Sequence, residues 1–385
     1  MSSTSAASPL DFHACVPFGA DLRVLLNSDV ISPGVISDLL KEKGVFIYSS
    51  DKKVTVPLLS STLLTPPEFL RLIEVSVNKE LVPKVRTTKF ELTDSKSDWL
   101  DTVRNGFDGQ IISTFADSAN GNVEIATPTI TVPRAGSLKI GYKLFKVDIS
   151  QDWIKRKVEY SGEIHFKQKE GSKILEVDLS RTSKETDEVN RRILKHAATA
   201  LKKEDMIKQE DGNKITFGSL QDYERVLFFK RLTAGTGVSL ELGTVNDMEI
   251  GRDKGMPELP DDPRVSWLNQ SVRRLEVDGD RLNDIFLISD DSYYRHYYVQ
   301  RMDVTFRYAF GPNSGETRIS FHFTSCKPDD RFSAEFEFEV LGIKSTSGRM
   351  NVDSKRDLNN QLKTVALELI HREYEAIIAA RRDDL

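Results

Sequence analysis

The chain has 385 residues, of which 39% are hydrophobic and 29% are charged, a composition typical of a globular protein with two or three domains. Its formal net charge of -5 argues against nonspecific nucleic-acid binding through bulk charge, although it is compatible with a local basic face. Two cysteines, Cys15 and Cys326, exclude a disulfide framework and favour a reducing cytoplasm. We find no signal peptide and no apolar run of about 20 residues, so we expect no membrane span.

The N-terminal part of the chain predicts a disordered tail followed by a small helical domain. Residues 1–10 are rich in serine and alanine, a composition typical of disordered segments. Residues 11–83 contain apolar residues at helical spacing, with Pro33 in a first helical turn and Gly44 where a helix stop is expected. Residues 65–68, Thr-Pro-Pro-Glu, predict the start of a further helix. Because compact helical units more often bind a nucleic acid or a partner than perform catalysis, we interpret residues 11–83 as a recognition domain.

The chain then changes to alternating apolar and polar residues, which predicts strands. We assign residues 84–242 to an α+β domain in which a hairpin, residues 157–166 and 173–179, precedes a charged helix over residues 184–203. A further helix, which Asp222 would cap, is apolar on two faces and is therefore expected at the centre of a domain. The other predicted strands of this domain are residues 89–92, 109–115, 123–125, 130–132 and 138–147.

A second α+β half is predicted at the C-terminal end. Residues 243–263 are rich in glycine, aspartate and proline and predict a loop or linker. Because strands followed by a charged helix occur twice, we predict an α+β fold with a small helical N-terminal domain, an antiparallel sheet and helix layers. The two halves are either related by duplication or alike by coincidence, since hairpins and helices are common. Within residues 264–385 the predicted elements are strands 303–310, 316–323 and 332–340 and a long helix over 354–382.

No arrangement of residues in the sequence is typical of an enzyme. His13 and Cys15 belong to no nucleophile–base motif, and the spacings of a zinc site or a phosphate-binding glycine loop are absent. The rival interpretation is a divalent-metal nuclease with a degenerate site, because Glu163 and Asp178 place acids on the predicted hairpin. The acidic-x-lysine motif of such nucleases is missing there, and alternating charge on a solvent-facing hairpin fits the residues better. We therefore predict no catalytic residue, no metal ion and no cofactor.

Three regions carry residue types that bind polyanions. Lysines flank the first predicted helix–loop–helix, basic residues gather on the helix over residues 184–203, and tyrosines alternate with basic residues in a predicted strand over residues 293–298. Each has a structural alternative: a solvated helix surface, cations that complement a helix dipole, or tyrosine pairing on a sheet. The candidate nucleic-acid-binding residues are Lys41, Lys43, Lys52, Lys53, Arg191, Arg192, Lys195, Lys202, Lys203, Tyr294, Arg295 and Tyr297.

Four segments of the sequence resemble one known family. They are residues 17–23 (PFGADLR), 39–46 (LLKEKGVF), 57–69 (PLLSSTLLTPPEF) and 215–233 (ITFGSLQDYERVLFFKRLT). Together they resemble the second, non-nuclease subunit of a two-gene bacterial anti-phage system encoded on Gamma-Mobile-Trio islands. In that family the partner gene encodes a PD-(D/E)xK-type nuclease, so the resemblance implies a hetero-oligomer with a nuclease. Residues 35–64 separately resemble a SAP-type helix–loop–helix, a fold often bound to DNA.

The sequence as a whole favours recognition over catalysis. We hypothesise a non-enzymatic, cytoplasmic subunit of an anti-phage defence complex that binds nucleic acid, with DNA as the expected ligand, and that holds or licenses a nuclease partner. The alternatives are the divalent-metal nuclease and a stand-alone DNA-binding regulator, which would bind DNA tightly and in a salt-dependent manner without a protein partner.

Overall fold

The chain, seen in a computed structural model, divides into two compact units, Met1–Val82 and Pro83–Leu385. The predicted tail, His13 and both cysteines lie outside the described residues. The structure describes residues 16, 18–27, 31, 33–49, 51–69, 72, 82–95, 98–107, 112, 114, 123–147, 157–237, 239–252, 255–258, 262, 274–279, 282, 286–324, 328–346, 350 and 352–383.

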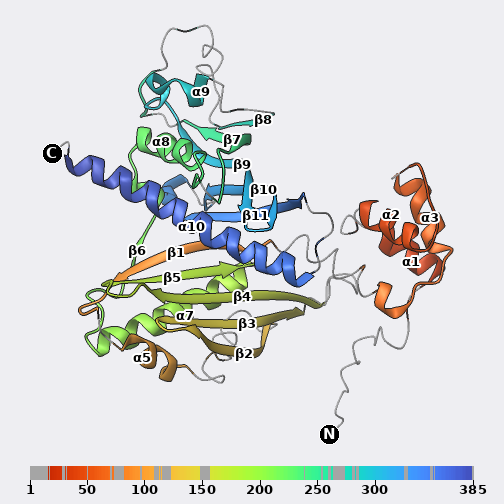
Figure 1. Cartoon of the computed structure of the whole chain (residues 1–385), viewed down its shortest axis with the longest axis horizontal. Coiled ribbons are helices and arrows are strands. Elements are labelled where there is room, and N and C mark those ends of the chain that lie inside the picture. Colours follow the sequence, from red (N-terminus) through yellow and green to blue (C-terminus); the bar gives the residue numbers. More distant parts are fainter. Residues whose placement is uncertain are drawn as a thin grey trace. The chain divides into compact units, whose positions relative to one another are not determined.

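The first unit is a cluster of short helices (Figure 1). It contains α1 (Gly19–Asn27), α2 (Pro33–Glu42) and α3 (Lys52–Ser60), and residues 66–69 are also helical. Both α1 and α2 contact α3, and the leucines that repeat at helical spacing on α1 and α2 are buried. The predicted helical character of the N-terminal region is therefore confirmed.

Local sequence sets the ends of these helices as predicted. Pro33 is the first residue of α2, where its missing N–H costs no hydrogen bond. Gly44 follows the end of α2 with φ of +77°, a conformation that glycine adopts without strain. The N–H of Thr65 donates to the Glu68 carboxylate at 2.7 Å, and the N–H of Glu68 donates to the Thr65 hydroxyl at 3.4 Å. This reciprocal pair is a capping box, which explains why a helix starts at this point.

The second unit is built on one sheet of eleven strands, in which neighbouring strands are antiparallel. The strand order is β2-β3-β4-β5-β1-β11-β10-β9-β7-β8, and β6 pairs with β1. Strand β1 therefore joins the two predicted α+β halves into one sheet. The strands are β1 (Lys84–Glu91), β2 (Val123–Arg134), β3 (Ser137–Val147), β4 (Lys157–Gln168), β5 (Ile174–Arg181), β6 (Asn213–Lys214), β7 (Thr244–Gly251), β8 (Arg274–Asp278), β9 (Tyr298–Phe310), β10 (Asn313–Phe323) and β11 (Phe336–Ser345).

Helices cover opposite faces of the two ends of this sheet, with α10 in front of it and α7 behind it in Figure 1. The alternation along β11 shows the two faces, because Phe336 and Phe338 enter the core under α8 and α10 whereas Glu337 contacts residues of the α7 side. The α+β class predicted from the sequence is confirmed. The helices are α5 (Trp99–Asn105), α7 (Lys184–Lys203), α8 (Asp222–Leu232), α9 (Phe286–Ser289), α10 (Val352–Asp383) and the 3₁₀ turns η1 (Phe217–Ser219), η4 (Asp291–Tyr293) and η5 (Pro328–Ser333).

Each helix layer encloses its own apolar core. One core lies between α5, α7 and strands β1 to β5, and the other lies between α8, α10 and strands β7 to β11. The second core is rich in aromatic rings, such as Phe228 of α8, whose ring centroid is 5.0 Å from that of Phe336. Because α7 covers only the first half of its sheet face, the same face of β7, β9 and β10 carries polar side chains, including Asp247, Arg301 and Asp303.

The assignment of residues 243–263 to a loop or linker is wrong for residues 244–251, which form β7 inside the sheet. Val245, Met248 and Ile250 are buried in the core, and this burial outweighs the turn-forming composition around them. The predicted strand over residues 109–115 is also wrong, since Ile112 and Thr114 are helical. A short apolar run does not distinguish a strand from a buried helical segment.

Two predicted boundaries differ from the structure. Asp222 is the first residue of α8, and Gln221 occupies the cap position, where its N–H donates to the Glu224 carboxylate at 2.6 Å. The strand predicted to start at residue 332 starts at Phe336, because η5 precedes it. For these two elements the type followed from periodicity, whereas the ends depended on local contacts that periodicity does not show.

Candidate functional site

The charged helix predicted over residues 184–203 is α7, with the same bounds. The N–H of Thr186 donates to the Ser183 hydroxyl at 3.1 Å, and the N–H of Ser183 donates to the Thr186 hydroxyl at 2.9 Å. The hydroxyl of Tyr142 on β3 lies 2.9 Å from the C=O of Thr186 and 2.8 Å from Oδ1 of Asn190. These contacts fix the first two turns of α7 against the sheet.

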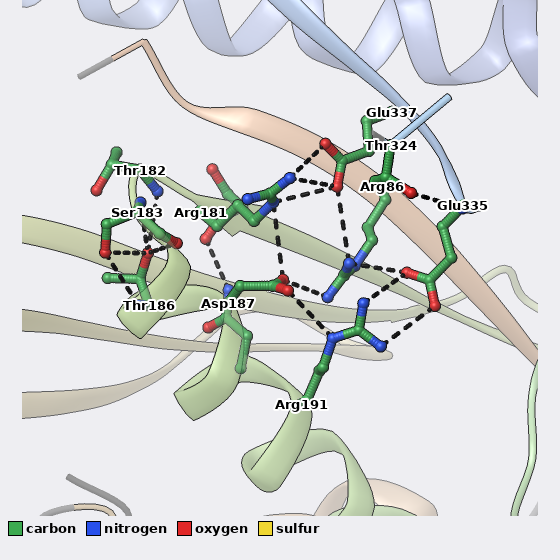
Figure 2. A network of polar contacts seen from close by, with 12 residues as sticks. Arg86, Arg181, Thr182, Ser183, Thr186, Asp187, Arg191, Thr324, Glu335 and Glu337 are labelled. Atoms are coloured by element: carbon green, nitrogen blue, oxygen red, sulfur yellow. Dashed lines mark hydrogen bonds and ion pairs between the residues drawn. The ribbon is translucent and has the colours of Figure 1, made fainter. Parts of the chain in front are cut away.

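Three arginines and three carboxylates form one network at this end of α7 (Figure 2). They come from segments that are far apart in the sequence and meet because β1 lies between β5 and β11. The three positive and three negative formal charges of these six residues cancel, and Lys214 adds a further ion pair with Glu335 at 2.8 Å. The members are Arg86 on β1, Arg181 on β5, Asp187 and Arg191 on α7, Glu335 immediately before β11 and Glu337 on β11.

The network is tight at its buried end and loose at its exposed end. The Arg181 guanidinium contacts both oxygens of Glu337, at 2.7 and 2.9 Å, and the Glu337 side chain is only 1% exposed. Arg86 is also buried and lies 2.8 Å from Glu335. The Arg191 side chain, by contrast, is 49% exposed and contacts Asp187 at 3.1 Å and Glu335 at 3.4 Å. Arg191 is therefore the network member best placed to exchange its acid for an external anion.

The buried end of the network is held by charge. Burial raises the pKa of Glu337, but hydrogen bonds with His322 and Arg181 outweigh burial and lower the pKa to about 2. Glu337 is thus ionised at neutral pH, and its charge is stable only while its partners remain. We interpret the pair of Arg181 and Glu337 as a structural connection between β5 and β11.

A cavity of about 700 Å³ opens beside the network on the α7 side of the sheet. Seven basic side chains and three acidic ones line it, so positive charge is in excess among the lining residues, and two acids outside the lining, Glu335 and Asp247, reduce this excess by pairing with Arg86 and Arg301. Clustered arginines suit phosphate oxygens, and the volume is within the range of ligand sites. The charged lining residues are Lys84, Arg86, Arg181, Lys184, Arg191, Arg301, Arg331, Asp187, Glu249 and Glu337.

The predicted basic residues of α7 do not form one surface. Arg191 lines the cavity, whereas Arg192 is ion-paired with Glu188 one turn earlier. Because neighbouring residues of a helix point in different directions, the members of the set are distributed around and along α7. The members that do not line the cavity are Arg192, Lys195, Lys202 and Lys203.

The prediction of a tyrosine-rich binding strand over residues 293–298 is wrong. Strand β9 begins only at Tyr298, and turns precede it. Tyr294 and Tyr297 are buried in the core under α8, where burial raises the pKa of Tyr297. Buried rings are unavailable for stacking on bases. Arg295 is exposed and lines a separate cavity beside α8.

The four predicted lysines of the first unit have different environments. Lys43 is internal, because its Nζ donates to the C=O of Leu63 at 2.8 Å and to Glu68 at 3.0 Å. It connects the end of α2 to the helical segment after α3 and is not a contact residue for an external ligand. Lys41 and Lys53 are exposed and Lys52 is half-buried.

The acids of the rival nuclease interpretation lie on the same face of β4 and β5, because Asp178 is opposite His165, two residues from Glu163. Each acid has a lysine partner: Lys139 lies 2.8 Å from Glu163, and Lys167 is ion-paired with Asp178. Within the described part of the chain, no group of three residues is placed to hold a metal ion. A cation bound between these acids would have to displace both lysines.

Helix α10 covers part of this polar face and carries His371, whose side chain is 14% exposed and whose Nδ1 lies 3.7 Å from Glu176. Burial, with the charges of Lys89 and Lys167, lowers the pKa of His371 to about 3 from 6.5. The unfolded chain therefore binds more protons than the folded chain between these two pH values. Unfolding free energy should fall as the pH falls through this window.

Replacing His371 by glutamine should flatten this dependence by up to about 1.4 kcal/mol per pH unit. The test is urea unfolding of the wild type and the variant at several pH values below 6.5. Parallel stability curves for the two proteins would contradict the placement of His371.

Sequence patterns had singled out neither Arg86 nor Arg181 nor Glu337. A signal was available on β5, where Leu175, Val177 and Leu179 face the core and Arg181 continues the same alternation. A charged side chain at a position that alternation assigns to the core requires an opposite charge nearby, so Arg181 indicates a buried ion pair.

Residues 20–81 match the model of a family described as the GAPS4b protein N-terminal domain. The match lies within the first compact unit. This family is associated with Gamma-Mobile-Trio islands, so the match supports the resemblance to a defence-associated protein. No curated protein and no solved structure matches the chain. None of the described helices combines the length and the apolar composition needed to cross a bilayer.

Proposed function

We propose that this protein is the non-catalytic subunit of a bacterial anti-phage defence complex that binds nucleic acid, DNA in particular, and holds or licenses a nuclease partner. The observation that carries the proposal is the match of residues 20–81 to the GAPS4b N-terminal domain. The matched segment coincides with a compact helical unit that presents Lys41 and Lys53 to solvent. A separate helical unit of this kind is suited to recognition.

The larger unit supports nucleic-acid binding through its cation-rich cavity. Lys184 is exposed at the start of α7, and the half-exposed Arg191 holds Glu335 only at 3.4 Å. Because the Arg191 side chain is 49% exposed, a phosphate oxygen can approach it, and Arg86 and Lys214 remain as partners of Glu335 if this long contact is exchanged. The buried pair of Arg181 and Glu337 stays intact and keeps the cavity in shape.

Partner association is tested by purifying the tagged full-length chain from its host and identifying co-purifying proteins by mass spectrometry. We expect a nuclease in stoichiometric amount. The purified chain alone is expected to cleave no nucleic acid when divalent metal is added. Metal-dependent cleavage that disappears in Glu163→Ala and Asp178→Ala, with folding retained, would establish the rival nuclease function instead.

Reversing the charge of Lys41, Lys52 and Lys53 to glutamate should weaken nucleic-acid binding at least about tenfold at low salt. Lys43 is left unchanged, since its contacts with Leu63 and Glu68 are internal. The slope of log affinity against log salt should fall by about 2 to 3, as expected for the loss of three phosphate contacts.

The matched control reverses three exposed lysines of the other unit, Lys169, Lys173 and Lys355, and so makes the same change in net charge. Affinity and co-purification are measured for both variants, with circular dichroism as the check of folding. Equal weakening by the two variants would show that binding depends on net charge and not on the first unit. Loss of the co-purifying nuclease in the first variant, with unchanged nucleic-acid affinity, would place the protein partner on Lys41, Lys52 and Lys53.

A further inference from the structure

The segment between α2 and α3 presents two aromatic rings to solvent. Phe46 is 81% exposed and Tyr48 is fully exposed. Val45, which precedes Phe46, and Ile47, which lies between the two rings, are half-buried. This alternation places both rings on the outer side of a non-helical stretch. Residues two apart in extended chain are separated by about 7 Å, a spacing that successive bases of a stretched single strand can match.

Basic residues flank this aromatic pair on both sides. Lys41 lies in the last turn of α2, and Lys52 and Lys53 begin α3. The contact of Lys41 with Asp38 at 3.3 Å is exposed and therefore weak enough to exchange for a phosphate. Asp38 and Glu42 of α2 and Asp51, the N-cap of α3, keep the local charge excess small, so electrostatics alone supplies little affinity. The rings have to supply most of it.

Aromatic side chains and lysines in one short segment suit a particular ligand. Stacking of a base on an aromatic ring contributes about 1–3 kcal/mol and needs a base that is not paired in a duplex. We propose that Phe46 and Tyr48 stack on two successive bases of a single-stranded nucleic acid, while Lys41, Lys52 and Lys53 contact its phosphates. This inference rests on the proposed nucleic-acid binding and names its ligand class and its aromatic contacts.

The test compares the full-length wild type with the double variant Phe46→Ala/Tyr48→Ala on a labelled oligothymidine and on a duplex of equal length. We expect tighter binding of the single strand by the wild type, and a loss on the order of a hundredfold in the double variant. Phe18→Ala is the control, because Phe18 is 71% exposed in the same unit but lies outside the segment. Its affinity should equal that of the wild type.

A spectroscopic readout separates stacking from a change in folding. The variant Phe46→Trp should keep its affinity, and its added tryptophan fluorescence should be quenched by the single strand, after subtraction of the signal from the three native tryptophans. Unquenched fluorescence with full binding would overturn the stacking geometry.

The outcomes distinguish this inference from the proposed function. Unchanged single-strand binding by Phe46→Ala/Tyr48→Ala, together with loss in the lysine variant, overturns the stacking inference and leaves nucleic-acid binding in place. Equal affinity for duplex and single strand also overturns it. Lost nuclease co-purification with unchanged affinity would make the rings a protein contact. A wild type that binds neither nucleic acid would refute the proposed function itself.

Discussion

Replacing Glu337 by glutamine is expected to lower the free energy of unfolding by about 3–5 kcal/mol, because it leaves Arg181 without its buried counter-charge. The two side chains share two contacts below 3 Å, and the Glu337 carboxylate is shielded from water. The neutral amide keeps the size of the side chain but not its charge, so the loss measures electrostatics and not packing. Urea unfolding followed by circular dichroism provides the measurement.

The control for this change is Glu339→Gln, two residues further along β11. Glu339 lies 3.9 Å from Lys84, whose side chain is partly exposed, so its loss should cost less than about 1 kcal/mol. Equal destabilisation by the two variants would contradict the assignment of the network as a buried structural connection.

The same carboxylate should make stability depend on acid pH. Its folded pKa of about 2 lies below the ordinary value of 4.5, so its stabilisation is complete above pH 4.5 and is lost as the pH falls toward 2. The difference in unfolding free energy between the wild type and Glu337→Gln should therefore shrink across this window. A constant difference would indicate that the variant acts through packing.

Replacing Gly162 by alanine is expected to cost about 3 kcal/mol of unfolding free energy by overpacking the core. Gly162 on β4 lies opposite Tyr142 on β3, and a Cβ atom there would come within 2.2 Å of the tyrosine ring. The tyrosine ring cannot move aside without losing the contacts of its hydroxyl with Thr186 and Asn190 of α7. Hydrogen exchange of the first turns of α7 should accelerate together with the loss of stability.

Two variants control for this result. Gly342→Ala on β11 adds a methyl group where no atom lies within 4 Å, so it should change stability by less than about 0.5 kcal/mol. The double variant Gly162→Ala/Tyr142→Leu should be less destabilised than the sum of its single variants, since leucine frees the space above residue 162. Additive effects would show that the two residues do not compete for that space.

Much of the secondary structure was predictable because it depends on neighbouring residues. The start of α7 follows from Ser183 and Thr186, which satisfy each other's backbone groups within four residues. The hairpin of β4 and β5 follows from period-two alternation interrupted by Gly171, which has φ of +72°. Where composition and packing disagreed, as in β7, the pattern alone led to the wrong assignment.

The candidate sites were less predictable, because a residue type does not reveal its environment. Tyr294 and Tyr297 have the residue pattern of a stacking surface, yet they are buried in the core. Phe46 and Tyr48 are exposed, although an aromatic residue beside apolar neighbours such as Val45 and Ile47 is equally typical of a core. Burial depends on the residues that pack from distant parts of the chain, so single-segment analysis does not determine it.

The sequence by itself determined the α+β class, the helical character of the N-terminal region and the resemblance of that region to a defence-associated family, since each depends on local spacing and residue order. Only the tertiary structure decided that β1 joins the two halves into one sheet and that Arg86, Arg181 and Glu337 meet beside a cavity. The physical reason is that ion pairing and burial depend on which strands are neighbours. Arg181 on β5 and Glu337 on β11 meet because both strands flank β1, and their separation in the sequence does not reveal this.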